Sequence, residues 1–401
     1  MTKEGINKEP FKIDRISREL WQSYTETSKP AIFVDALSNW HVDERWSPES
    51  LARAVGHKRV TVSFAKNGGF FFNRSVSSDW KKACDFDMVD MDFADAIRAI
   101  FSANAGEQIY VLQQSLKDRL PELLENLSVP DFVQLSKADI NLFVGRDTRG
   151  ALHHDCSDNF FAQVYGTKKF IIFSPEDSAY LYPYPSDAHM LHFSYVNAND
   201  PDFTRYPKYA LTSPIVFELR AGDLLFLPAY WWHQVDGNGI SVSVNTWISG
   251  RFSQIIDAPN SVRGLLAAYR DDRLAKFKDE CLSAAHLDLT SAANLLLARG
   301  KTCGAGVLAL AAFDDLTAEL HQHGRSQGCT LKELSEELGH VCDIIRAQPS
   351  ISQEVKAALE PIPQLACAAS ECDDAKIASS EVTSLLEAIG ELNKTGICQS
   401  G

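Results

Sequence analysis

The chain has 401 residues, of which 45% are hydrophobic and 23% charged, an ordinary balance for a globular protein. Its formal net charge of −14, with no Lys/Arg block, argues against a nucleic-acid partner, because phosphate backbones are bound by clustered positive charge. No apolar run is long enough to cross a bilayer, so we expect no membrane-spanning helix and no membrane partner.

Two features predict the compartment. The first residues are polar and charged and lack the apolar stretch of a secretory signal. The nine cysteines are scattered without a CxxC pair, which indicates reduced thiols rather than a disulfide framework. We therefore expect a cytoplasmic protein, or a nuclear one if the source is a eukaryote.

Residues 1–106 mix helical and extended patterns and are predicted to support the core. Strands with β-branched or apolar runs are expected at 31–37 and 59–65. Helical periodicity, with a Ser-Pro start and Gly56 as a stop in the second case, predicts helices at 15–27, 47–56 and 92–103.

Residues 107–251 form the predicted catalytic core. One helix is expected at 116–127, with Pro121 near its start. Short strands, punctuated by Gly, Pro and Asp turns at spacings of roughly ten residues, favour a sandwich or barrel. We predict a jelly roll, the double-stranded β-helix, with flanking helices and with strands in the segments 107–116, 140–145, 151–156, 159–166, 168–175, 214–235 and 240–248.

Residues 252–401 are rich in Ala, Leu, Glu and Lys at helical spacing and predict an all-helical region for dimerisation or docking. A zinc cluster of His321, His323, Cys329 and His340 is rejected, because residues two apart on a helix diverge and the spacing fits no known ligand pattern. Helices are expected at 261–286, 289–300, 306–324, 330–348, 352–362 and 379–394.

A candidate metal motif lies in the core. His153 and Asp155 are two apart, so a strand directs both side chains to one face and His154 to the other. His233 follows a Gly-Asp turn, an apolar strand and the aromatic run 230–232. Two histidines and one carboxylate leave three open positions on an octahedral ion, the facial arrangement of non-haem iron(II) oxygenases.

A second reactant is expected beside this motif. Open coordination positions suit a bidentate 2-oxo acid and dioxygen, and the distal carboxylate of 2-oxoglutarate needs a buried cation. Lys168 and Lys169 follow the turn at Gly166, and strand alternation alone does not choose between them. Asn159 and Asn245 are candidate polar contacts at the metal-bound end of this co-substrate.

The segments HHDCSDNFFAQVYGTKKFIIFSP, GDLLFLPAYWWHQV and ISVSVNTW resemble the JmjC hydroxylases of the cupin-like class, closest to the asparaginyl hydroxylases of hypoxia-inducible factor. The resemblance covers about residues 28–250. It implies a double-stranded β-helix with iron(II), 2-oxoglutarate and dioxygen, and often a homodimer built by C-terminal helices. It implies His153, Asp155 and His233 as iron ligands and Lys168 as the partner of the co-substrate tail.

The resemblance also implies further pocket residues, with departures. Asn159 and Asn245 match positions near the co-substrate, and Gln113 matches one that faces the cavity. The family's tyrosine at the co-substrate tail falls on Val111, which leaves Tyr110 on the opposite face unless the register slips.

Two more departures concern residues that contact the co-substrate or the target side chain. The family's threonine falls on Gly150, with Thr148 as the substitute. The family's Arg-Gln pair that grips a target amide falls on His192 and Phe193, so asparagine hydroxylation does not transfer, because a buried amide there loses its partners.

The predicted function is hydroxylation of a C–H bond in a protein or peptide side chain, with succinate and CO2 as co-products. No catalytic residue beyond the metal centre is predicted. His154, Trp231 and Trp247 are further candidates for the substrate cavity. The alternatives are hydroxylation of a small molecule, such as a free amino acid or natural-product peptide, N-methyl-lysine demethylation, and a cupin-like binding protein without catalysis.

Overall fold

The structure is a computed structural model that describes residues 11–13, 28–66, 68–73, 75, 80–104, 106–127, 137–185, 188–249, 251–270, 278–282, 285–317, 331–370 and 377–395. The chain divides into two compact units. Unit 1 comprises residues 1–73, 83–183 and 192–250, and unit 2 comprises 74–82, 184–191 and 251–401. Within the described residues, no helix has the length and apolar character needed to span a bilayer.

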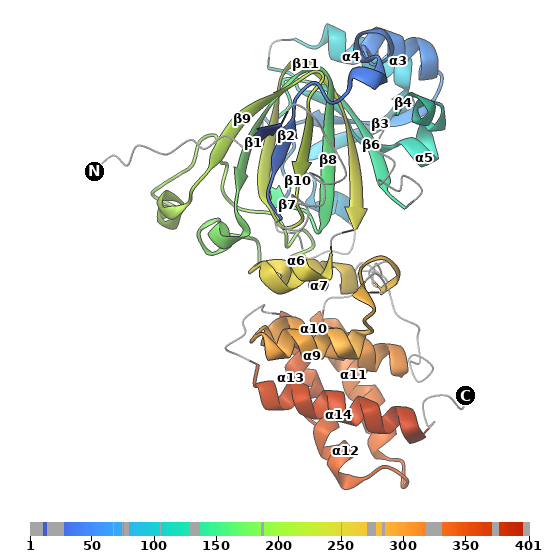
Figure 1. Ribbon diagram of the computed structural model, residues 1–401, viewed down its shortest axis with the longest axis vertical. Helices are drawn as coiled ribbons and strands as arrows, with labels where there is room; N and C mark the ends of the chain where they lie inside the picture. The colour runs from blue at the N-terminus through green and yellow to red at the C-terminus, as the bar shows by residue number, and fades with distance from the viewer. Residues whose placement is uncertain are drawn as a thin grey trace. The chain divides into compact units, whose positions relative to one another are not determined.

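Unit 1 is built on one sheet that is antiparallel except for its parallel β1–β2 pair and that is continuous through two long strands, β8 (Ser157–Phe173) and β11 (Trp232–Ser249) (Figure 1). The other strands are β1 (Phe11–Ile13), β2 (Ala31–Phe33), β3 (Arg59–Ala65), β4 (Phe86–Asp92), β5 (Ile109–Ser115), β6 (Asp139–Arg146), β7 (His153–His154), β9 (Ile215–Arg220) and β10 (Leu224–Leu227). The path runs β1-β2-β10-β8-β11-β6-β5-β3-β4, with β7 on β11 and β9 on β8.

The two long strands make the jelly roll. β8 turns at Gly166, whose φ of +69° suits a residue without a side chain, and β11 shifts register between Asn238 and Val242. The first half of β8 therefore pairs with β10, whereas its second half pairs with β9. This confirms the predicted jelly roll, but β8 was predicted as two strands, at 159–166 and 168–175, and β11 as the end of the segment 214–235 and a separate strand at 240–248.

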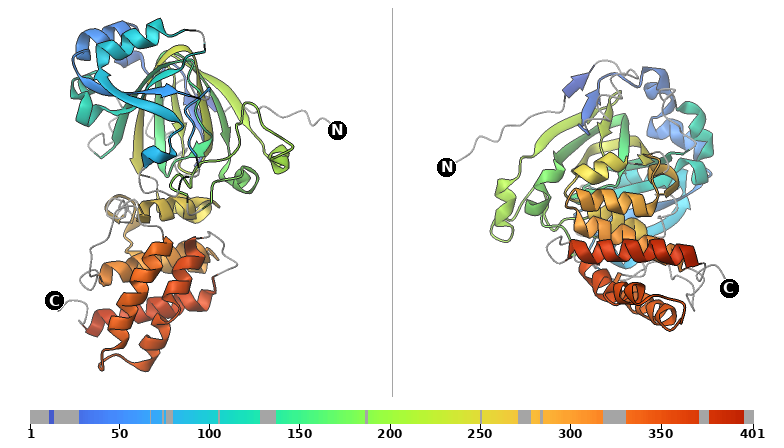
Figure 2. Two further views of the ribbon diagram at one scale, coloured as in Figure 1. Left: turned by 180° about the vertical axis from the view of Figure 1, so that it is seen from behind. Right: turned by 60° about the horizontal axis from the view of Figure 1, so that its bottom comes forward.

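Helices cover the outer side of the sheet. The described ones are α2 (Val42–Arg45), α3 (Pro48–Val55), α4 (Phe93–Ser102) and α5 (Leu116–Arg119), with 3-10 turns η1 (Ser38–Trp40), η2 (Trp80–Ala83), η3 (Pro121–Asn126), η4 (Pro175–Tyr180) and η5 (Pro207–Leu211). The apolar faces of α3 and α4 join a core cluster with residues of β3, β5, β6 and β11. Figure 2 shows these two helices beside the sheet from behind.

Two differences from the expected elements have local causes. The helix predicted at 116–127 is divided into α5 and η3, because Pro121 cannot donate a helical hydrogen bond and Leu120 before it leaves the helical conformation at φ −136°, ψ 49°. Strand β4 was not predicted, since its half-exposed acidic sequence lacks apolar alternation. The helix predicted at 15–27 lies outside the described residues.

Unit 2 is helical throughout its described C-terminal part, as predicted. Its elements are α6 (Phe252–Asp257), α7 (Ser261–Arg270), the π-helix η6 (Lys278–Leu282), α9 (Leu289–Ala298), α10 (Thr302–Leu316), α11 (Leu331–Arg346), α12 (Gln353–Leu359), α13 (Ile362–Ser370) and α14 (Ser379–Thr395). Helix α10 is buried from Thr302 to Asp314 and packs against α7, α9, α13 and α14. It is therefore the central helix of this unit.

Candidate metal centre

Three side chains from two strands and the turn after one of them meet at one point. His153 on β7 pairs directly with His233 on β11, and Asp155 follows β7. The Nε2 atoms of His153 and His233 lie 3.9 and 3.7 Å from the two carboxylate oxygens of Asp155. One ligand atom from each residue lies within 4.8 Å of the others. Since metal–ligand bonds are about 2 Å long, this spacing suits three atoms that share one ion.

Backbone carbonyls orient both imidazoles. The Nδ1 atom of His153 lies 3.0 Å from the carbonyl oxygen of Ala151, and that of His233 lies 3.1 Å from that of Trp231. A proton on each Nδ1 then donates to the carbonyl and leaves the Nε2 lone pair free for a metal. Burial, together with the neighbouring His153, lowers the pKa of His233 to about 4, so its imidazole is neutral near pH 7.

An unpartnered oxygen supports a metal at this point. The Oδ2 atom of Asp155 is buried and has no hydrogen-bond partner among the described residues. A buried carboxylate oxygen without a partner is costly, and a cation is a natural partner. The donor set of two imidazoles and one carboxylate therefore fits a divalent first-row metal with open positions.

Lys168 lies in a sealed pocket on the inner side of the sheet. Its side chain is 1% exposed, and its Nζ donates to the hydroxyl of Tyr110 at 3.0 Å. The rings of Tyr110, Phe143 and Phe161 surround Nζ, with centroids 5.2–5.5 Å away. Burial lowers the pKa of Lys168 to about 7. No carboxylate of the described residues pairs with it, so the pocket can accept an anion.

Lys169 points to the other side of β8. Its Nζ donates to the side chain of Asn199 at 2.7 Å in an exposed position. Strand alternation therefore separates the two lysines, and the one that the resemblance selects is the buried one.

Tyr110 was expected on the face of its strand that points away from the co-substrate, unless the register slips. A register shift in β5 between Val111 and Gln114 breaks the strand alternation, and Gln113 within it has φ +52°. Tyr110 and Val111 lie before this shift in regular pairing, where Tyr110 faces Lys168 and Val111 packs in the outer core, whereas Gln113 within the shift is exposed. The prediction that Val111 takes the tyrosine's place on the cavity side is therefore corrected, because Tyr110 itself contacts Lys168.

Thr148 lies next to the Tyr110 ring. It is 2% exposed, and a Cβ built on Gly145 would meet both the Thr148 methyl group and the Tyr110 ring at 2.6 Å. Gly145 is thus the residue that lets these two side chains approach the strand. Thr148 therefore lies beside the tyrosine that contacts Lys168, and its role in co-substrate binding stays a prediction.

Three buried amides share the inner face of the sheet. Asn245 pairs with Asn141 on β6 and with Phe161 on β8, and Asn159 is two residues from Phe161 on the same face. Each amide is at most 5% exposed and has one atom without a hydrogen-bond partner among the described residues. Asn159 and Asn245 were predicted, whereas Asn141 was missed because its position opposite Asn245 depends on strand register.

The remaining predicted cavity residues fall on different sides. Trp247 faces the same way as Asn159, its register partner, and its buried Nε1 has no partner among the described residues. Trp231 donates from Nε1 to the Ser28 carbonyl at 3.0 Å. It packs against a hydrophobic cluster that includes Phe161 and Phe170. His154 is buried, and the centroid of its ring lies 4.6 Å from that of Trp232.

The pair predicted to replace the family's amide grip lies against the metal ligands. The ring of Phe193 stacks on that of His153, with centroids 4.8 Å apart and an interplanar angle of 9°. The carbonyl of His192 accepts a hydrogen bond from the backbone N–H of His154 at 3.1 Å. Phe193 thus covers one side of His153 with an apolar surface.

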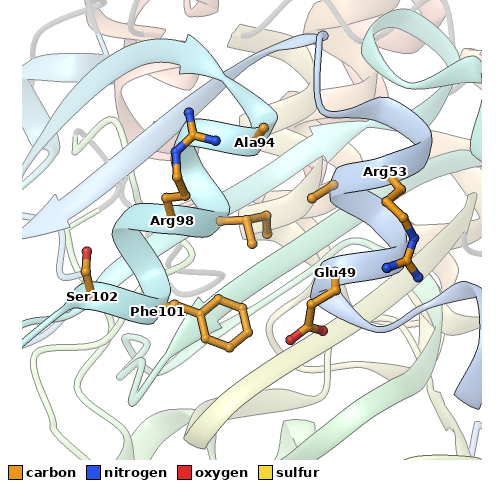
Figure 3. Close-up of a pocket in the computed structure, with 8 residues that line it drawn as sticks. Glu49, Arg53, Ala94, Arg98, Phe101 and Ser102 are labelled. Atoms are coloured by element: carbon orange, nitrogen blue, oxygen red, sulfur yellow. The ribbon is translucent and has the colours of Figure 1, made fainter.

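A separate hollow of about 640 Å³ lies between α3 and α4 (Figure 3). Arg53 and Glu49 come from α3, and Arg98 and Phe101 come from α4. None of its lining residues belongs to the His–Asp–His group. We therefore assign the chemistry to the group on β7 and β11.

Comparison with known proteins agrees with this geometry. The family model described as a cupin-like domain matches residues 17–254, more than half of the chain. Lysine-specific demethylase 8 of Xenopus tropicalis is 28% identical over 233 residues, which cover 56% of this chain and 49% of that protein. The protein of the same name from Danio rerio is 30% identical over 235 residues, covering 56% and 54%.

A relative with a different name is also similar to this chain. The tRNA wybutosine-synthesizing protein 5 of Gallus gallus is 24% identical over 250 residues, which cover 59% of this chain and 75% of that protein. The chain spans about half the length of the two demethylases. The chain belongs to the cupin-like family in its JmjC form, the family of iron(II)- and 2-oxoglutarate-dependent oxygenases that its sequence resembles.

Proposed function

We propose that this protein is an iron(II)- and 2-oxoglutarate-dependent oxygenase that oxidises a C–H bond in a side chain of a protein or peptide. The observation that carries the proposal is the group of His153, Asp155 and His233, whose ligand atoms lie within 4.8 Å of one another. The sealed Lys168 pocket on the inner side of the same sheet supports a dicarboxylate co-substrate.

The roles of the residues follow from their contacts. His153, Asp155 and His233 would hold the iron, which supplies the oxidising chemistry when it binds with 2-oxoglutarate and dioxygen. Lys168 and Tyr110 would bind the distal carboxylate of 2-oxoglutarate, with Thr148 beside them. Asn159 and Asn245 would orient the co-substrate end nearest the metal, and Phe193 and Trp231 would keep water from the centre.

Hydroxylation and N-methyl-lysine demethylation are equally supported as outcomes. Both begin with oxidation of a C–H bond, and the relatives named lysine-specific demethylases favour a protein substrate. Similarity to the tRNA wybutosine-synthesizing protein 5 does not lead us to propose an RNA substrate. A net charge of −14 is unfavourable for binding phosphate backbones. Gln113, His154, His192 and Trp247 stay candidates for the substrate side of the cavity.

The helical C-terminal region is proposed as a dimerisation or docking module. Residues 252–401 lie almost wholly beyond the matched cupin-like domain, and their central helix α10 gives them a core of their own. Sedimentation of the full chain would test the homodimer.

The test of the reaction is conversion of 2-oxoglutarate to succinate by iron(II)-loaded protein in air. We expect turnover by the wild-type chain and none by His153→Ala, with Asp200→Ala as an exposed control. A chain that consumes no 2-oxoglutarate under these conditions is a binding protein, and the proposal fails. Mass spectrometry of a peptide library then separates the outcomes, as a gained oxygen atom indicates hydroxylation and a lost methyl group indicates demethylation.

A small-molecule substrate is the remaining alternative. It predicts an unchanged peptide library beside oxidation of a free amino acid or natural-product peptide. The same succinate assay, run with each class of substrate, measures which one stimulates turnover.

A further inference from the structure

One arginine of the helical unit fixes both ends of a loop from the middle of the sequence. The Nη1 atom of Arg263 on α7 donates to the carbonyl oxygens of Tyr184 at 2.6 Å and Leu191 at 2.9 Å. The loop 184–191 and α7 belong to the same compact unit. Hydrogen bonds from a guanidinium are stronger than neutral ones, so Arg263 fixes where the chain leaves this loop.

The residues that follow the loop run beside the first metal-ligand strand. Leu191 is followed by His192 and Phe193, and Phe193 forms an antiparallel bridge with His153. The N–H of His154 donates to the His192 carbonyl at 3.1 Å, and that of Ser194 donates to the Leu152 carbonyl at 2.9 Å. The exit of the loop therefore sets the position of the Phe193 backbone relative to β7.

Phe193 in turn holds the imidazole of His153. The rings of Phe193 and His153 are nearly parallel at 9° with centroids 4.8 Å apart, and the centroid of the Phe72 ring lies 4.7 Å from that of Phe193. The ring of His233 lies 4.2 Å from His153. The stack on Phe193 and the Nδ1 contact with the Ala151 carbonyl thus act together on the orientation of the His153 ring.

We propose that Arg263 and Phe193 are positioning residues of the metal centre: Arg263 sets the path of the chain into Phe193, and Phe193 fixes the ring of His153. The inference rests on the proposed metal centre. Arg263 itself contacts none of the three ligands and would act only through the chain that continues from Leu191 into Phe193. A side chain on α7 would then affect metal affinity without touching the metal.

The test is titration of the metal-free, full-length chain with cobalt(II), followed by its visible absorption. We expect Phe193→Leu to weaken cobalt(II) binding about tenfold, as do losses of other groups that orient ligands, and to change the ligand-field spectrum. Phe193→Tyr keeps the flat ring and should bind like the wild type. Phe203→Leu, at a 55% exposed phenylalanine, is the matched control.

Arg263 is tested through its coupling to Phe193. Arg263→Met should weaken cobalt(II) binding about threefold to tenfold, and Arg299→Met, at an exposed arginine of the same unit, should not. Because both residues act along one route, the double variant should bind no more weakly than Phe193→Leu alone. If Arg263→Met does not fold, Arg263→Lys, which loses the fork but keeps the charge, should show a smaller loss with an unchanged circular dichroism spectrum.

The outcomes separate the two proposals. A wild-type chain that binds no cobalt(II) contradicts the metal centre itself. Wild-type binding with equal affinity in Phe193→Leu and in the Arg263 variants overturns only the positioning roles. Additive losses in the double variant would overturn the route through Phe193.

Discussion

The two ends of the proposed site differ in how their charges meet solvent. At the metal end, the side chains of His153 and Asp155 are 25% and 22% exposed, so reactants can reach them. At the lysine end, Lys168 is 1% exposed and is enclosed by aromatic rings. The open end suits exchange of dioxygen and substrate, whereas the sealed end suits a co-substrate tail that stays bound during the reaction.

The difference has an electrostatic consequence. A charge at the open end is stabilised by water until a metal binds, but the ammonium of Lys168 has only a hydroxyl as its hydrogen-bonding partner among the described residues. Substitution of a metal ligand should therefore abolish succinate formation. Substitution of Lys168 should mainly alter 2-oxoglutarate binding and protein stability.

The largest effect is expected at the open end, for Asp155→Ala. Orienting groups alone change metal affinity by about 10- to 100-fold, so loss of a direct ligand should weaken iron(II) binding by more than about 1,000-fold and stop succinate formation. Binding is measured anaerobically by titration. An Asp155→Ala chain that retains wild-type affinity would place the metal elsewhere.

Next in size is Lys168→Met, which tests the sealed end. Loss of one partner of a buried charge pair should weaken 2-oxoglutarate binding by at least about 100-fold. The co-substrate-free protein should become more stable, because the variant removes a buried ammonium without an anionic partner. Lys169→Met is the matched control on the opposite face. Thermal unfolding with and without 2-oxoglutarate measures both effects, and a destabilised Lys168→Met protein would contradict this view of the pocket.

Tyr110→Phe should have a smaller effect at the same end. It removes the hydroxyl that accepts from Lys168 while the ring stays, so the KM for 2-oxoglutarate should rise about tenfold. An unchanged KM would show that Lys168 binds the co-substrate without this tyrosine. Tyr165→Phe, at a 37% exposed tyrosine, should leave the KM unchanged.

The smallest effect expected is a pH dependence of stability. Burial lowers the pKa of Lys168 from 10.5 to about 7, so between these values the unfolded chain binds a proton that the folded chain does not. Stability should therefore rise with pH through this window, by at least about 2 °C in the midpoint of unfolding. The rise attributable to Lys168 is the difference between the wild type and Lys168→Met, and identical profiles would contradict the lowered pKa.

How far the sequence predicts this site depends on how local each feature is. His153 and Asp155 are two apart on one strand, so their shared direction follows from the alternation of a strand. The partner His233 was predicted by the apolar strand before it and by the resemblance. These features depend on spacing and composition, which a single sequence contains.

The remaining features depend on register between distant strands. Tyr110 rather than Val111 faces Lys168, and no residue pattern in the segment marks which of the two faces inward. Asn141 lies opposite Asn245 because of the register in which β6 and β11 pair. The two residues are far apart in the sequence, so a local pattern does not reveal this pairing. The stack of Phe193 on His153 also joins residues that are distant in the sequence. Its formation depends on how the chain folds between them.

The most direct measurement is anaerobic titration of the metal-free wild-type chain with iron(II), with and without 2-oxoglutarate. Our account predicts one iron per chain, bound more tightly when 2-oxoglutarate is present, because both then occupy one site. A chain that binds no iron, or that binds it with an affinity that 2-oxoglutarate does not change, would contradict the account.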